Sequence, residues 1–410
     1  MSGSTGEGTP HPAQWRRNAR ALATGNLLIN IGWNASFAFL PLIVQTLGVE
    51  RDLALWVGAM MLGYYGVSCV FTPVWGMLAD HYGRKSMVLR AAFGMAAGFG
   101  LLAMTSHPVL FLVVLVFAGL ANGFVPAGQA LVATTTPQQH IGGALALTQI
   151  GASAGTLLGP LVGAALIGWL PTKQSLFWLT AAAMLVAGIL ASTAVREHHV
   201  RPAHALRIDV IADAKRLSHL PELKLLYYMQ MLFAFCAFGA TQVVALHTME
   251  LVARRSGLLG LGVEGWVAAT AVGFTLAGLV ALPFWGRLID RLHPARVLAL
   301  LLAGVCLSSV LTPLARDPLE LTLARVVFAI FVSGLPPVLI RMIKDRAPPG
   351  MEGRTLAYGT SLQQAGSAVA PLIGGLLAPY LGLRGFFWLC SGLLIVGWAL
   401  WRRRMRGITT

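Results

Sequence analysis

Stretches of about twenty apolar residues recur along the whole chain, and this feature limits the possible folds more than any other. A helix rises about 1.5 Å per residue, so roughly twenty apolar residues cross the hydrocarbon core of a bilayer. In lipid the backbone must satisfy its own hydrogen bonds, which favours helices. The sequence therefore predicts an all-α membrane protein with twelve transmembrane helices. The apolar stretches lie at 21–47, 54–75, 86–105, 108–133, 141–169, 175–195, 223–249, 264–286, 295–314, 318–341, 354–380 and 384–402.

One long polar stretch, residues 196–222, separates the sixth apolar stretch from the seventh. Its spaced charges favour an amphipathic linker that lies on the membrane surface. The chain is therefore predicted to divide into two six-helix bundles, 21–195 and 223–402, joined by the linker 196–222. Short tails, 1–20 and 403–410, complete the chain.

The charged residues indicate how these helices are oriented. Only 11% of the 410 residues are charged, against about 25% in a soluble protein. Of the 30 Lys and Arg, 23 lie in the N-terminus, the C-terminus and the loops after even-numbered spans; six lie in the opposite loops and one inside a span. By the positive-inside rule both termini are cytoplasmic. This pattern explains the net charge of +15, so we expect no nucleic-acid partner.

The two halves of the sequence resemble each other at a fixed offset. Residues 73–80, PVWGMLAD, return 210 positions later as PFWGRLID at 283–290. The pair Gly159-Pro160 in GPLVG likewise corresponds to Ala370-Pro371 in APLIG. An internal repeat of this kind predicts two pseudo-symmetric six-helix bundles with a binding site between them, near the bilayer midplane.

A short charged loop, GMLADHYGRKSMVLR at residues 76–90, connects the second and third apolar stretches. Its glycines allow a chain reversal, and its basic residues hold it on the cytoplasmic side. The pattern G-x-L-A-D-x-x-G-R-K resembles the loop 2–3 signature of the major facilitator superfamily, and the resemblance extends from about residue 15 to residue 405. An ordinary charged loop of another membrane protein is the alternative. The residues assigned to this gate loop are Gly76, Asp80, Gly83, Arg84, Lys85 and Arg90.

The fifth apolar stretch carries small residues at four-residue spacing. Such spacing leaves one helix face without side chains and allows a neighbouring helix to approach closely, while a proline can kink the helix. The stretch resembles the fifth-helix motif of the antiporter branches of the superfamily, although Ala146 and Ala164 replace two of its glycines. Ordinary small-residue packing is the alternative. The residues concerned are Gly151, Gly155, Gly159, Pro160 and Gly163.

Arg325 is the one basic residue inside a predicted span. Drug efflux pumps of the superfamily usually carry an arginine in the fourth helix, at the position that is Leu115 here, and Arg325 occupies the equivalent position of the second half. A charge at this depth costs on the order of 3 kcal/mol on insertion scales. Arg325 either faces the cavity and meets an anionic group of the substrate, or extends to the outer surface near Asp317 and Glu320.

Amide side chains within the spans outline a candidate cavity. The resemblance implies that the first, fourth, seventh and tenth helices line it. Hydrogen bonds between helices are the alternative role for each of these residues. A cavity with amides and few charges suits amphiphilic ligands better than sugars. The predicted cavity residues are Asn30, Asn34, Asn122, Gln230, Gln242 and Arg325.

No aspartate or glutamate lies in the middle of a span, although proton-coupled transporters generally need a titratable group within the membrane. His247, near the outer end of the seventh span, has a suitable side chain, and Asp80 could respond to protons at the gate loop. An interfacial histidine that only forms hydrogen bonds is the alternative for His247.

The resemblance is to twelve-span drug:proton antiporters, and it implies proton-driven export of drugs or other amphiphilic compounds across a bacterial inner membrane by alternating access. The alternative is a specific uptake or facilitative carrier for a small organic anion or another metabolite. The chain has no phosphate-binding G-x-x-x-x-G-K-[ST] loop, so we expect neither ATP nor another cofactor. We also expect no metal site, no enzymatic activity and a monomer whose partners are the substrate, protons and lipid.

Overall fold

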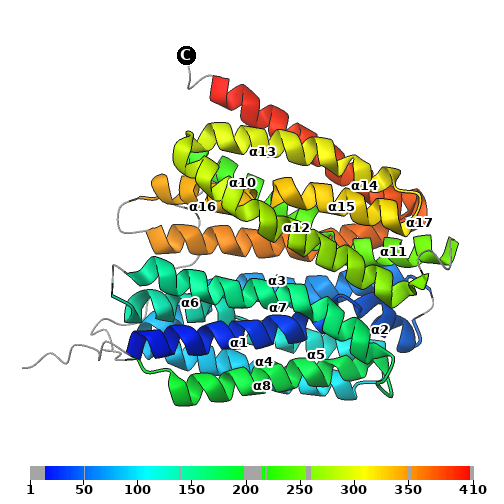
Figure 1. Cartoon of the computed structure of the whole chain (residues 1–410), viewed down its shortest axis with the longest axis horizontal. Helices are drawn as coiled ribbons and strands as arrows, with labels where there is room; N and C mark the ends of the chain where they lie inside the picture. The colour runs from blue at the N-terminus through cyan, green and yellow to red at the C-terminus, as the bar shows by residue number, and fades with distance from the viewer. Residues whose placement is uncertain are drawn as a thin grey trace, which may run out of the picture.

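The structure, a computed structural model, describes residues 14–49, 51–137, 140–197, 215, 217, 219–254, 260–348 and 352–406. The helices run side by side along one long axis, with those of the N-terminal half on one side and those of the C-terminal half on the other (Figure 1). Most of the predicted linker, and the side chain of Asp80, lie outside the described residues.

Two of the six spans in the N-terminal half consist of two helices. The first span is bent by 52° between α1 and α2, and the fourth is interrupted between α5 and α6. The helices are α1 (Gln14–Phe37), α2 (Leu40–Thr46), α3 (Leu53–Tyr82), α4 (Arg84–Met104), α5 (Pro108–Ala121), α6 (Phe124–Thr135), α7 (Ile141–Ile167), η2 (Lys173–Ser175) and α8 (Leu176–Ala194).

The C-terminal half repeats this plan with its own interruptions. A short π-helical segment, η3, divides the seventh span, and the tenth span is interrupted between α15 and α16. The elements are α10 (Pro221–Ala234), η3 (Phe235–Gly239), α11 (Thr241–Arg254), α12 (Val263–Arg291), α13 (Pro294–Ser309), α14 (Leu311–Leu314), α15 (Pro318–Val332), α16 (Leu335–Asp345) and α17 (Glu352–Arg406).

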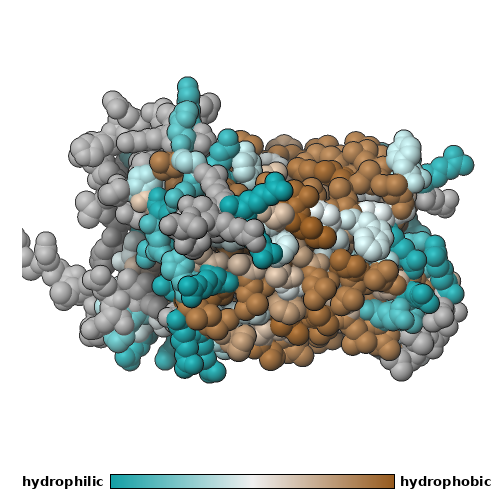
Figure 2. All heavy atoms as spheres, turned by 90° about the horizontal axis from the view of Figure 1, so that it is seen from above, coloured by the Kyte–Doolittle hydropathy of each residue, from teal (hydrophilic) through white to brown (hydrophobic). Residues whose placement is uncertain are grey.

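Among the described residues, ten helical stretches are long and apolar enough to cross a membrane, and the bent α1–α2 pair is an eleventh. The last of the ten runs from Tyr358 to Arg403. It divides in two at Gly382, whose φ of 65° breaks the helix within α17. The predicted all-α fold with twelve spans is therefore confirmed. Figure 2 shows the expected surface, with apolar residues around the middle of the molecule and hydrophilic residues towards both ends.

The internal repeat has a structural counterpart. The Trp75 indole Nε1 donates to the backbone O of Leu120 at 3.0 Å, and the Trp285 Nε1 donates to the backbone O of Ile330 at 2.6 Å. Both members of each pair are offset by the 210 residues of the repeat. A tryptophan on the second helix of each half thus has the same role, which is to bind a carbonyl at the interruption of the fourth span.

The two halves contact each other chiefly through α3 against α17 and α7 against α12. The backbones come close: a Cβ on Gly58 would lie 2.5 Å from the backbone O of Pro371, and one on Gly375 would lie 2.4 Å from that of Ala54. Each half also has its own apolar core, one formed mainly by residues 19–195 and the other by residues 217–401. The exact bounds of the two bundles stay a prediction.

Candidate functional site

The gate loop reduces to a single residue between two helices. α3 ends at Tyr82, Gly83 has φ 93° and ψ 146°, and α4 begins at Arg84. A positive φ of this size favours glycine, since other residues clash there. A Cβ on Gly76 would meet nothing within 4 Å, so packing within the described residues does not demand a glycine there. Asp80 lies on α3, with its side chain outside the described part.

Glu197, just after α8, binds the first turn of α4. Its Oε1 accepts from the backbone N of Arg84 at 3.0 Å, and its Oε2 accepts from the backbone N of Lys85 at 2.7 Å. The Lys85 ammonium in turn donates to the backbone O of Ser192 at 3.0 Å. A carboxylate is stabilised here because the first N–H groups of a helix are unpaired and carry partial positive charge. The sequence prediction missed Glu197, although an acid directly after a span was a usable signal.

Arg90 lies at the interruption of the fourth span. Pro126 has no N–H to bind the backbone O of Asn122, so that carbonyl lacks its helical partner. The Arg90 guanidinium lies 3.6 Å from the Trp75 ring and donates to the backbone O of Asn122 at 3.2 Å and of Leu120 at 3.4 Å. Arg90 therefore stabilises a break that the sequence prediction had drawn as one continuous helix.

The glycines of α7 lie against α1. A Cβ on Gly151 would lie 2.2 Å from the backbone O of Ala23, and one on Gly155 would lie 2.4 Å from that of Leu27. Gly159 and Gly163 make similarly close contacts one and two turns further along α1. The face without side chains thus allows the two helices to pack backbone against backbone.

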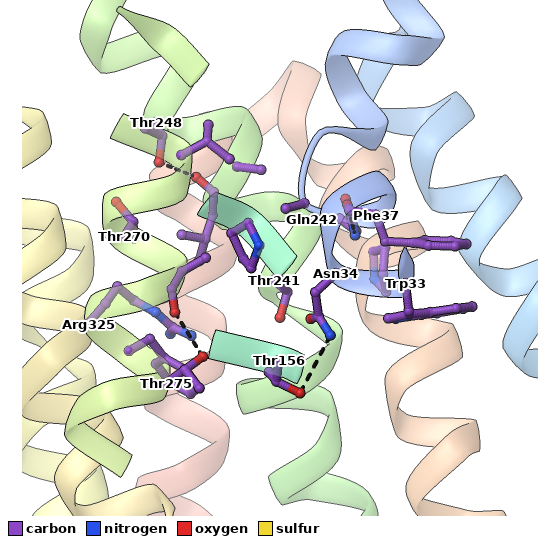
Figure 3. Close-up of a pocket in the computed structure, with 18 of the residues that line it drawn as sticks. Trp33, Asn34, Phe37, Thr156, Thr241, Gln242, Thr248, Thr270, Thr275 and Arg325 are labelled. Carbon is purple, nitrogen blue, oxygen red and sulfur yellow. Dashed lines mark hydrogen bonds between the residues drawn. The ribbon is translucent and has the colours of Figure 1, made fainter. Parts of the chain in front are cut away.

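A pocket of about 210 Å³ lies between the two halves. Side chains from α1, α3 and α7 form one wall, and side chains from α11, α12, α15 and α17 form the other (Figure 3). The lining is mainly apolar and aromatic, with hydroxyl groups at intervals. The aromatic residues are Trp33, Phe37, Tyr65 and Phe274, and the threonines are Thr156, Thr241, Thr248, Thr270 and Thr275. Sequence reasoning looked for amides and charges and so missed these threonines.

Two of the predicted amide residues line the pocket. The Asn34 Nδ2 donates to the backbone O of Asn30 at 2.9 Å and lies 3.5 Å from the Thr156 hydroxyl. The Gln242 Nε2 donates across the two halves to the backbone O of Phe37 at 2.9 Å. The Gln242 Oε1 is buried and accepts no hydrogen bond within the described part of the chain.

Arg325 also lines the pocket. This placement corresponds to the alternative in which the side chain faces the cavity rather than the outer surface. Its side chain is 5% exposed, and its guanidinium carbon lies 4.7 Å from the Phe274 ring centroid and 5.0 Å from that of Phe328. It forms no ion pair with any described carboxylate. Its charge is therefore stabilised by aromatic faces while remaining available to a group that enters the pocket.

The other predicted cavity residues lie outside the lining of this pocket. Asn30 donates to the backbone O of Asn26 at 2.8 Å, and Asn122 donates to the Ser68 hydroxyl at 2.8 Å. Gln230 is buried, and its Nε2 lies 3.3 Å from the Oε1 of Gln363. The Asn30 bond lies within α1, but its Oδ1 also accepts from the Thr156 hydroxyl of α7 at 3.4 Å, so in this conformation each of the three amides connects two helices.

His247 lies on α11 and is 1% exposed. Its Nδ1 is 3.3 Å from the Oε2 of Glu250, and its ring centroid is 5.7 Å from that of Phe387. The neighbouring Thr248 lines the pocket, whereas His247 does not. The described residues contain no group of three or more His, Cys, Asp or Glu arranged to hold a metal ion.

The halves also meet at the end of the molecule opposite the gate loop. There the Lys173 ammonium on η2 lies 3.4 Å from the Oε1 of Glu264 on α12, and α2 contacts α11. Together with the Gln242 bond to Phe37, these contacts join the two halves at the α2–α11 end.

Two six-helix halves, a one-residue gate loop and a pocket between the halves define a secondary transporter. The chain belongs to the Major Facilitator Superfamily, whose family model matches residues 22–272 and 259–407. It is a membrane transporter and not an enzyme.

Among individual proteins, the chain is similar to the multidrug resistance protein MdtG of Salmonella paratyphi C. The two are 30% identical over 407 residues, which cover 97% of this chain and 98% of that protein. MdtG of a Rahnella species is 29% identical over 408 residues, covering 98% of this chain and 97% of that protein. A mutant of the nucleoside transporter NupG has a similar structure, with a TM-score of 0.79, 12% identity, and coverage of 94% of this chain and 99% of that one. At such low identity this likeness concerns the fold alone.

Proposed function

We propose that this protein exports drugs and other amphiphilic small molecules by alternating access, in exchange for protons. The observation that carries the proposal is the pocket between the halves, which is mainly apolar and aromatic but holds a few convergent polar groups and one cation. The similarity of the chain, over nearly its full length, to proteins named for multidrug resistance supports the same conclusion.

The chemistry of the pocket favours ligands with a broad apolar body and one polar end. Trp33, Phe37 and Phe274 offer flat apolar surfaces, which bind varied rings without demanding one shape. The Gln242 Oε1, which has no hydrogen-bond partner among the described residues, can accept from an N–H or O–H of the ligand. Such a mixture of large apolar surface and few directional groups supports binding of varied amphiphiles rather than of one sugar.

The contacts between the halves at the α2–α11 end support an alternating-access cycle in which this end closes the pocket on its own side. To release substrate on the other side, the Lys173–Glu264 and Gln242–Phe37 contacts must break. We propose that Asp80 and Arg84 then tie the gate-loop ends of the two halves together. The gate-loop residues Gly76, Gly83, Lys85 and Arg90, and the glycine face of α7 with Pro160, would keep each half rigid during this motion.

Two residues are proposed to bind the exchanged proton. His247 is buried beside a carboxylate near the pocket wall, and imidazole titrates in the physiological range. Asp80 is the second candidate, at the gate loop.

A specific carrier for a small organic anion is the second candidate function, and Arg325 favours it. Its guanidinium faces the pocket without a carboxylate partner among the described residues. An arginine offers a planar fork of donors that matches a carboxylate or phosphate group.

We propose that the protein acts as a monomer in a bacterial inner membrane, with both termini in the cytoplasm. The distribution of Lys and Arg supports this orientation.

Purified protein in liposomes, with an imposed pH gradient and an internal pH dye, tests the proposal. A panel of cationic, neutral and anionic amphiphiles is added in turn. Proton movement triggered by several unrelated compounds, and absent in Asp80→Asn, supports a multidrug antiporter. Transport of a single anion without proton movement supports the specific carrier instead.

A further inference from the structure

We propose that Glu250 and His247 form a proton-exchange pair at the end of the molecule opposite the gate loop. In this pair Glu250 passes a proton between the aqueous surface and the buried His247. The inference rests on the proposed proton-driven function and adds the route by which the proton arrives.

The two side chains differ sharply in their access to water. His247 is 1% exposed, whereas the Glu250 side chain is 37% exposed and lies one helical turn away on α11. The 3.3 Å between His247 Nδ1 and Glu250 Oε2 is within reach for proton transfer. A buried imidazole therefore has a direct connection to solvent through a single carboxylate.

The two nitrogens of His247 have different surroundings. Nδ1 faces Glu250, whereas Nε2 is buried and has no hydrogen-bond partner in the described structure. In the transfer step the O–H bond of a protonated Glu250 breaks, and an Nδ1–H bond forms on an imidazole that already carries hydrogen on Nε2. The products are an imidazolium and a carboxylate that remain paired. Because Nε2 has no acceptor among the described residues, a proton can leave His247 only back through Glu250 until the surrounding helices move.

The surrounding charges favour Glu250 as the one route. Arg254 binds the Oε1 of Glu250 at 2.5 Å and leaves Oε2 to His247. Arg384 of α17 and Arg254 are the basic groups that act electrostatically on His247, and Glu250 supplies the opposite charge beside it. α12 and α15 also contact α11, but their nearby acids are engaged elsewhere: Glu264 with Lys173 and Glu320 with the backbone N of Arg316.

The position of the pair connects proton binding with the pocket. α11 carries His247, the pocket residue Thr248 and Gln242, which bonds to Phe37 across the two halves. A new charge on His247 therefore acts on the helix that closes the pocket. Under the proposed orientation, this end faces the side from which protons enter.

The test compares two assays in liposomes on Glu250→Gln, His247→Asn and the control Glu320→Gln, an exposed acid at the same end of the molecule. Drug-for-drug exchange measures binding and alternating access without net proton movement, and gradient-driven transport measures coupling. The amide introduced by Glu250→Gln keeps hydrogen-bonding atoms for His247 and Arg254 but cannot carry a proton. We expect both pair variants to retain exchange and to lose gradient-driven transport down to the level of empty vesicles, while Glu320→Gln keeps both activities.

Glu250→Gln with normal proton-coupled transport would overturn the proton route. Loss of exchange together with coupling in this variant would also overturn it, because Glu250 would then be a structural residue. Wild-type protein that shows neither activity would instead contradict the proposed function itself.

Discussion

Replacing Gly155 with alanine should separate α1 from α7. An added Cβ would lie 2.4 Å from the backbone O of Leu27 and 2.7 Å from the Cβ of Asn30, whereas ordinary contacts begin near 3.4 Å. The helices would have to move apart by close to the difference between these distances and an ordinary contact. Gly151 and Gly159 lie in the same helix contact, so their packing would be disturbed as well. Overpacking of this kind costs about 1–3 kcal/mol.

Gly143→Ala is the matched control, since it lies on the same helix and a Cβ there meets nothing within 4 Å. Alanine is favoured over glycine within a helix by up to about 1 kcal/mol. Both variants gain this term, so they should differ in stability by the overpacking cost alone, roughly 1–3 kcal/mol. Thermal unfolding of both proteins in the same detergent, followed by tryptophan fluorescence, measures the order. Gly155→Ala as stable as Gly143→Ala would refute close α1–α7 packing.

Four further substitutions test the site. Arg325→Ala should weaken transport of anionic compounds more than that of neutral ones, measured as competition against a fluorescent substrate; an equal loss for all would make it a structural arginine. Lys173→Glu should speed opening of the α2–α11 end, because an exposed ion pair contributes up to about 1 kcal/mol. Adding Glu264→Lys should restore the wild-type rate. A double variant that still opens faster than wild type would argue against the pair. Glu197→Gln should lower the free energy of unfolding by about 1–2 kcal/mol in thermal unfolding. The carboxylate that accepts from two backbone N–H groups is replaced by a neutral amide with one acceptor oxygen. Asp80→Asn should abolish transport with normal membrane insertion on immunoblots, and full activity would remove the gate proposal.

Periodicity and the internal repeat predicted the architecture because lipid imposes a simple rule on every span. A stretch of twenty apolar residues has few alternatives to a helix, and the two-half plan follows from PVWGMLAD and PFWGRLID. The interruptions were less visible. The break near Asn122 depends on Arg90 and Trp75 reaching across from other helices, and local sequence does not report such contacts.

The candidate site was predicted only in part, because local sequence does not report contacts between helices. Arg325, Gln242 and Asn34 stand out in an apolar sequence, and all three line the pocket. Gln230 stands out equally, yet it bonds to Gln363 within its own half. Which face of a helix meets the pocket is decided by packing between helices, which the sequence does not state.

The most direct test of alternating access is a pair of spin-label distances across the two halves, in a background with the four cysteines replaced by alanine. One pair joins the exposed positions Thr172 and Leu261 near the α2–α11 end, and the other joins Thr134 and Lys344 near the gate-loop end. Adding an amphiphilic substrate under a pH gradient should lengthen one distance and shorten the other. Two distances that stay unchanged, or that change in the same direction, would contradict alternating access around the pocket.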